Sequence, residues 1–211
     1  MNSSHEQKKR ALIEEITAAF DGVSRENGVS FRESRVIDDY GSDEERAKAR
    51  SEDTETRWQD VPDDDIYHAY ACLSFLDEIG FHYYIPAFVV WFLRYMDTED
   101  PDFASETSGS LIYHLNLSDD EILTDLYLSR YKFFTHEQSK AIAHFLEFVE
   151  EQEDAFRKED SQRQQQRLSD EGLTPEEIDA HWREVEEYRV ELDVPDNEAR
   201  RALDRYWRQW K

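Results

Sequence analysis

The chain is poor in cysteine, glycine and proline, the residues that disulfide-bonded proteins, cysteine zinc sites and many-stranded folds need. Its 211 residues include one cysteine, six glycines and five prolines. The single cysteine, Cys72, excludes an intramolecular disulfide and a four-cysteine zinc site, as expected for a reducing compartment. So few turn-forming residues disfavour a barrel or sandwich of short strands and suit a few long helices. The composition therefore predicts an all-α or mainly α fold.

Signals for secretion or membrane insertion are also missing. The N-terminal sequence MNSSHEQKKRALIEEI has a basic patch but no apolar stretch behind it, so we do not expect a secretory signal. The longest apolar run, from Ile85 to Leu93, contains a proline and is far shorter than the roughly 20 residues that span a bilayer. We therefore expect a cytoplasmic protein.

Acidic side chains dominate the charge. Fifty Asp and Glu residues against 25 Lys and Arg residues give a net charge of −25. This charge repels nucleic-acid phosphates and anionic membrane surfaces, so neither is an expected partner of the body of the protein. Two interpretations of the acid excess stay open. It keeps the protein soluble, or an acidic face meets a basic partner.

Apolar side chains recur at helical spacing in the N-terminal half. The first helix should run from about Glu6 to Phe20, with Gly22 as its stop. Residues 21–57 are charged and poor in large apolar side chains, apart from a few, which indicates a long loop. A short helix in DEERAKARSE is the one element that this stretch suggests.

The next two helices should form the best-defined part of the core. Asp63 or Asp64 can cap a helix that ends at Gly80. A second helix should begin near Pro86, where a missing N–H is tolerated. Apolar residues from Ala87 to Leu93 cover every side of that helix, which predicts burial all round.

Capping boxes mark two helix starts in the C-terminal half. Thr135 with Gln138 begins one helix, and Thr174 with Glu177 begins another. The apolar stripe of the first comprises Ile142, Phe145, Leu146 and Val149, extended by Phe156. Before these, residues 97–110 should form a loop, and Ser118 can cap a helix through Ile122, Leu123 and Leu126.

The same half suggests a division of the chain. Residues 157–167 contain no apolar side chain and should project into solvent. The connection between the two capped helices is short, which predicts an antiparallel hairpin. We expect an acidic helical domain over residues 1–156, able to fold alone, and an accessory C-terminal helical extension over residues 157–211.

The order of several segments resembles an uncharacterised bacterial domain-of-unknown-function family. These segments are ALIEEITAAFDGV, Trp58 ahead of a helix ending LSFLDEIGF, then HYYIPAFVVWFL, and later YKFFTHEQSKAIAHFLEFV. The resemblance covers roughly Ala11 to Glu150. Because the activity of that family is unknown, the resemblance implies boundaries and no chemistry.

Aromatic residues suggest a candidate binding surface. They gather in the segment from Phe81 to Tyr95, where a pocket or partner groove rimmed by polar aromatic groups and a packed aromatic core are both open interpretations. The candidate surface residues are His82, Tyr83, Tyr84, Trp58, Trp207 and Trp210.

Signals for catalysis or metal binding are weak. His144 with Glu147 has the spacing of a helical metal pair, and His82 lies near Asp77 and Glu78, but such pairs arise by chance in a chain this acidic. No phosphate-binding loop, nucleophile elbow or zinc-protease motif occurs. We therefore expect no metal ion and no cofactor, and the sequence assigns no catalytic residue.

Residues 200–211 reverse the charge of the chain. Arg200, Arg201, Arg205, Arg208 and Lys211 stand against Asp204 alone, with tryptophans between them. A nucleic-acid or membrane-surface helix would have this composition. We favour the alternative that the segment docks on the acidic body of its own chain or of a twin subunit.

The resulting functional hypothesis is a non-enzymatic, acidic cytosolic protein-interaction module that binds another protein or itself. An immunity-like or inhibitor-like role would suit its charge. The alternative is a small enzyme or metal-binding protein with a site near His82, Asp77 and Glu78.

Overall fold

The structure, a computed structural model, describes residues 3–98, 106–192 and 194–210. Within these ranges the chain forms α-helices and two short 3₁₀ turns, and no strand occurs. The predicted all-α fold is thereby confirmed. None of the helices in the described ranges combines the length and the apolar character that a bilayer crossing requires.

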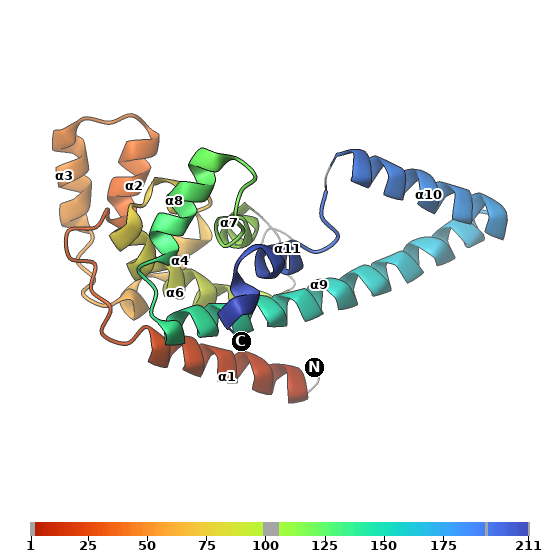
Figure 1. Cartoon of the computed structure of the whole chain (residues 1–211), viewed down its shortest axis with the longest axis horizontal. Helices are drawn as coiled ribbons and strands as arrows, with labels where there is room; N and C mark the ends of the chain where they lie inside the picture. Colours follow the sequence, from red (N-terminus) through yellow and green to blue (C-terminus); the bar gives the residue numbers. More distant parts are fainter. Residues whose placement is uncertain (1–2, 99–105, 193, 211) are drawn as a thin grey trace.

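Helix α6 (Glu78–Tyr95) is the central helix of a compact body. Its buried side chains include aromatic and aliphatic residues on every side, which confirms the predicted all-round burial. The helices that pack on it include α1 (Ser3–Ala19), α4 (Asp63–Tyr67), α7 (Glu106–His114) and α8 (Glu121–Tyr131), and side chains of α9 contact it as well. Trp58 to Asp60, the 3₁₀ turn η1, also packs on it (Figure 1).

The start of α6 corrects two sequence predictions. The helix begins at Glu78, so Pro86 lies inside it, and the expected single helix before Gly80 is broken into α4 and the short α5 (Cys72–Phe75). Asp77 caps α6 by accepting from the Gly80 N–H at 2.8 Å. Gly80 is therefore no stop. A Cβ there would lie 2.4 Å from the Val29 carbonyl oxygen, so glycine permits a close approach of two segments.

Residues 21–57 contain two helices where a long loop was expected. They are α2 (Phe31–Asp38) and α3 (Asp43–Glu52), and α3 coincides with the DEERAKARSE segment. The two pack on each other and α2 packs on α5. Helices α2 and α3 both begin at capping-box patterns, Ser30 with Glu33 and Ser42 with Glu45, but their apolar pattern is weak because charged groups join them. Glu33 of α2 accepts from Arg50 of α3 at 2.9 Å and from Arg46 at 3.2 Å.

Helix α8 turns its aliphatic residues outward. Its cap is Asp120 and not the expected Ser118, because the Asp120 carboxylate accepts from two backbone N–H groups of the first turn. Tyr127, Arg130 and Tyr131 face the core instead. Ile122, Leu123 and Leu126 are exposed. The expected loop over residues 97–110 lies partly outside the described residues, and its end, residues 106–110, is the start of α7.

Helix α9 (His136–Asp170) extends far beyond the body, and α10 (Pro175–Glu191) runs back along it (Figure 1). Both predicted capping boxes are present, and the predicted hairpin and the solvent projection of residues 157–167 are confirmed. We call residues 157–191 the arm. No residue of α10 is fully buried, and partly buried Leu168, Ile178 and Trp182 lie along its seam with α9.

The C-terminal segment returns to the body as α11 (Glu198–Arg205) and the 3₁₀ turn η2 (Trp207–Trp210). Leu203 and Trp207 belong to the same core as α6, and both pack with complete loss of exposure. Arg200 pairs with Glu150 of α9 at 2.8 Å. The expected docking of this basic segment on the acidic body is confirmed. The expected division after residue 156 falls inside α9, and the core continues on both sides of it.

Cys72 lies buried beneath α2. The Ser34 hydroxyl donates to its sulfur at 3.1 Å, and burial raises the pKa of the thiol to about 12. The thiol is therefore protonated and out of contact with solvent in the folded protein.

Candidate functional site

A network of charged groups surrounds the hydroxyl group of Tyr84, which is fully buried. This hydroxyl accepts from Arg25 at 2.7 Å and from the Phe31 N–H at 3.1 Å, and it donates to Glu55 at 2.6 Å. Burial, followed by the hydrogen bond to Glu55, raises the pKa of Tyr84 well above its usual range. The phenol is therefore a neutral link between α6 and the segments around α2.

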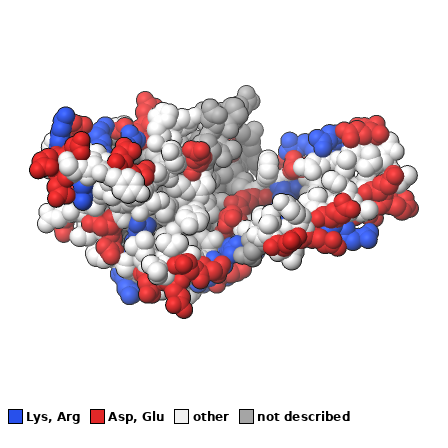
Figure 2. All heavy atoms as spheres, turned by 90° about the horizontal axis from the view of Figure 1, so that it is seen from above, with Lys and Arg blue, Asp and Glu red and all other residues white. Residues whose placement is uncertain are grey.

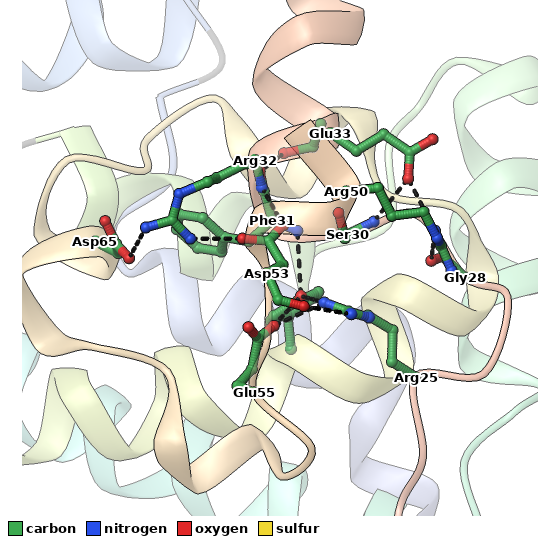
Figure 3. Close-up of polar contacts among 12 residues, drawn as sticks. Arg25, Gly28, Ser30, Phe31, Arg32, Glu33, Arg50, Asp53, Glu55 and Asp65 are labelled. Atoms are coloured by element: carbon green, nitrogen blue, oxygen red, sulfur yellow. Dashed lines mark hydrogen bonds and ion pairs between the residues drawn. The ribbon is translucent and has the colours of Figure 1, made fainter. Parts of the chain in front are cut away.

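Arginine and aspartate side chains extend this network (Figure 3). Asp53, whose side chain has no exposure, accepts from the Arg32 guanidinium at 2.6 Å and from the Arg32 N–H at 2.7 Å. Arg32 also reaches Asp65 at 2.9 Å. Each charge drawn thus has an opposite charge or a backbone partner. Such a closed network stabilises the packing of α2, α3 and α4 and offers no reactive group.

Four of the six candidate surface residues belong to the packed core. Tyr83, Tyr84, Trp58 and Trp207 are all buried. The indole N–H of Trp58 donates to the Phe20 carbonyl at 2.9 Å, and that of Trp207 donates to the Leu115 carbonyl at 2.7 Å. Of the two interpretations left open by the sequence, the packed aromatic core describes these four residues.

The other two candidate residues are partly exposed. His82 packs beside Phe134, and its Nε2 lies 2.9 Å from the Gln138 side-chain oxygen. Burial lowers the pKa of His82. Trp210, near the C-terminus, packs edge-on against His136, with ring centroids 5.6 Å apart. His82 and Trp210 therefore sit in separate ring contacts.

The acidic residues near His82 have other partners. Asp77 accepts from the Val29 N–H at 2.9 Å as well as capping α6, and Glu78 accepts from the Ser129 hydroxyl at 3.0 Å. His144, the other candidate ligand, bonds Glu15 of α1 at 2.8 Å. None of these contacts assembles His82 with its acidic neighbours into an acid–base pair.

A serine and a histidine that the sequence did not connect meet between α5 and α7. The exposed Ser74 hydroxyl lies 3.1 Å from Nε2 of His114, which is buried. Burial and then the charge of Arg130 lower the pKa of His114 to about 3. So weak a base does not activate a hydroxyl group at neutral pH. The pair is a structural hydrogen bond, and no sequence signal could reveal it because the partners are far apart in the chain.

Possible metal ligands meet where α1 approaches the end of α6. The ligand atoms of His5, Glu6 and Asp97 lie within 4.8 Å of one another. The Lys9 ammonium group contacts Asp97 at 2.5 Å and Glu6 at 3.3 Å. A lysine cation therefore already pairs with both carboxylates where a metal ion would bind them.

An apolar cleft of about 620 Å³ opens where the arm leaves the body. Helices α6, α7 and α9 line it, chiefly with Phe92, Met96, Ile112, Val149 and Phe156. Phe156 was expected to extend the buried stripe of α9, but its side chain is 65% exposed. A further groove of about 310 Å³ between α9 and residues 195–198 shares Glu153, Phe156 and Glu198 with the cleft. We call the cleft and this groove together the notch.

Fold and surface together define an acidic, all-α protein that has a helical arm and an apolar notch at the base of that arm. The chain belongs to a family of unknown function, DUF6714, whose model matches residues 8–188. The match confirms the resemblance stated above and extends it past residue 150 to include most of α10. No curated protein and no solved structure matches the chain.

Proposed function

We propose that this protein is a non-enzymatic protein-interaction module of the cytoplasm and that a partner protein binds in the notch. The observation that carries the proposal is the exposed Phe156 beside an apolar cleft of about 620 Å³. Soluble proteins seldom leave a contiguous apolar hollow open unless it receives a ligand or another protein. An immunity-like or inhibitor-like role would be one form of this function.

The shape of the molecule supports a protein partner. No residue of α10 is fully buried, so this helix adds little to the core of the body. The stability of the body therefore does not explain why the arm is present. The arm contributes Arg157 and Asp160 to the lining of the notch and extends the surface that a partner could contact. A structured element that stabilises little by itself is more readily explained by binding.

Affinity capture with matched variants tests the proposal. Phe156→Glu places a charge at the mouth of the cleft, and Ile122→Glu makes the same kind of change on α8, where Ile122 is 80% exposed. We expect the wild type and the Ile122 variant to retain a common protein from a lysate of the source organism, and the Phe156 variant to lose it. Binding should then be reproduced with the purified partner.

Two results would contradict the proposal. If all three proteins retain the same partners, the notch is not the binding surface. If sedimentation shows that the wild type is a dimer and that the Phe156 change alone dissociates it, a second copy of the chain occupies the notch.

A further inference from the structure

We infer that the occupant of the notch is a basic amphipathic helix of the partner, with apolar side chains in the cleft and a Lys or Arg side chain against Glu153. The inference rests on the proposed function and specifies the chemistry of the partner. It follows from the length, the lining and the charge of the notch.

The notch is long enough for a short helix. Along α9 it extends from Val149, in the cleft, to Asp160, in the groove. At 1.5 Å per helical residue this separation corresponds to about 16 Å, or roughly three turns of a bound helix. The notch is apolar in the cleft and mostly charged along the groove, and an elongated surface of this kind suits an amphipathic helix whose anchoring side chains recur on one face.

The cleft has room for incoming side chains. Gly109 of α7 lies on its lining, and a Cβ atom built at Gly109 would meet no atom of the described residues within 4 Å. Glycine is otherwise a poor helix former, and an Ala residue here would strengthen α7. The open space above Gly109 can therefore be filled by design, which provides a test that leaves every charge unchanged.

Glu153 is an acidic group set within the apolar surface. Its carboxylate accepts from two backbone N–H groups at the start of α11, that of Ala199 at 3.5 Å and that of Glu198. Burial raises its pKa, although these bonds and the charge of Arg157 act in the opposite direction. Among the described residues no Lys or Arg side chain, Arg157 included, comes within ion-pair distance of it. A partly desolvated carboxylate gains more from a cation than an exposed one does. A cation supplied by the partner would complete this site.

The rest of the rim is also acidic. Glu198 borders the notch on the side opposite α9, and Asp160 and Asp196 border its outer part. Arg157 is the basic residue of the described lining, and both Arg157 and Arg189 pair with Asp196 at 2.8 Å. The acidic character of the rim thus comes from Glu153, Glu198 and Asp160. The rim therefore favours a basic helix over an acidic one, both in affinity and in the rate of encounter.

Peptide binding provides the test. The probe is a synthetic helix-forming peptide of roughly 14 residues, with leucine on one face and lysine on the other. A second peptide has glutamate in place of lysine. Using calorimetry at about 0.1 M salt, we expect the intact wild-type chain to bind the lysine peptide and not the glutamate peptide. Glu153→Gln should weaken binding at least about tenfold.

Glu151→Gln is the matched control. Glu151 lies two positions away on the same helix but faces α1, where it pairs with Lys8 at 2.6 Å. Both substitutions remove one charge, so they reduce the general attraction of an acidic protein for a basic peptide equally. We expect the control to change affinity less than about twofold, because the exposed pair is screened by solvent. Equal weakening by both substitutions would overturn the inference.

Gly109→Leu tests the cleft without changing charge. The added side chain should fill part of the apolar space and abolish peptide binding, while thermal unfolding shows that the fold persists. Unchanged binding by this variant would place the peptide elsewhere and overturn the inference. If the cellular partner depends on Phe156 but not on Glu153, the interaction function stands and the basic helix is ruled out. If no partner depends on Phe156, the proposed interaction function is itself wrong, and the inference about the basic helix falls with it.

Discussion

Two adjacent tyrosines of α6 are equally buried and differ in what their hydroxyl groups contact. Tyr84 bonds three groups, whereas the Tyr83 hydroxyl has no hydrogen-bond partner among the described residues. Tyr84→Phe should therefore lower the free energy of unfolding by about 1–3 kcal/mol, because it leaves buried groups unpaired. Tyr83→Phe should leave it unchanged or slightly higher. Urea unfolding of both variants measures this difference, and equal effects would contradict the assignment.

His114 should make stability depend on pH. Its pKa is about 3 in the folded protein, against an ordinary value of 6.5. Between these values the unfolded chain binds a proton that the folded chain does not, so stability falls as pH drops below about 6.5. Between about pH 7 and pH 5 this group should remove about 2 kcal/mol.

His114→Gln removes that titration and retains a polar side chain near Ser74. The pH dependence of unfolding should therefore be smaller in the variant by the same amount, as urea titrations at the two pH values will show. Parallel pH profiles for wild type and variant would mean that His114 becomes protonated without opening the fold.

At the scale of elements, the arm and the C-terminal helix should differ sharply in what they contribute. Arg157 pairs with Asp196, so the two ends of the arm lie close together. Replacing residues 161–193 by a short flexible linker should change the melting temperature by only a few degrees. A chain ending at Phe156 also loses Trp207, and it should be less stable by at least about 3–5 kcal/mol. Thermal unfolding of both proteins decides between this expectation and independent folding of residues 1–156.

Local sequence signals predicted several of the helices, but not every helix that carries such a signal. The capping boxes at Thr135 and Thr174 and the apolar stripe of α9 act within a few residues, so they are legible in the chain. The start of α6 was missed because Asp77 serves a distant backbone group, that of Val29, as well as its own helix. Helices α2 and α3 also begin at capping-box patterns, Ser30 with Glu33 and Ser42 with Glu45, so the missed signal was local. The ion pairs that join these two helices follow no apolar period, and the apolar pattern alone therefore indicated a loop.

The notch was beyond prediction for a related reason. Its walls come from α6, α7, α9 and the start of α11, which meet only through tertiary packing, so no local pattern reports the space between them. The composition did predict an acidic protein, but the position of Glu153 among apolar residues depends on how α9 and α11 pack. Phe156 was misjudged because its spacing fits the buried stripe, whereas the body ends before that turn of α9.

At the scale of the whole molecule, acidic side chains are distributed over the body and along both sides of the arm, with fewer basic ones among them (Figure 2). With a net charge of −25, their mutual repulsion destabilises the folded state. Salt screens this repulsion, so the melting temperature should be higher at about 0.5 M than at about 0.02 M sodium chloride. Scanning calorimetry measures the shift. A lower melting temperature at high salt would mean that attractive ion pairs outweigh the repulsion.

The burial of the sole cysteine makes the chain suited to labelling chemistry. Cys72 is covered and protonated in the folded protein, so a maleimide or a similar reagent reaches it only when the core opens. At saturating reagent, the rate of Cys72 modification therefore equals the rate at which the core opens. The measurement uses the native sequence and gives a single labelled product. A cysteine introduced on the arm can be labelled selectively in the same molecule, because the native thiol reacts too slowly to compete.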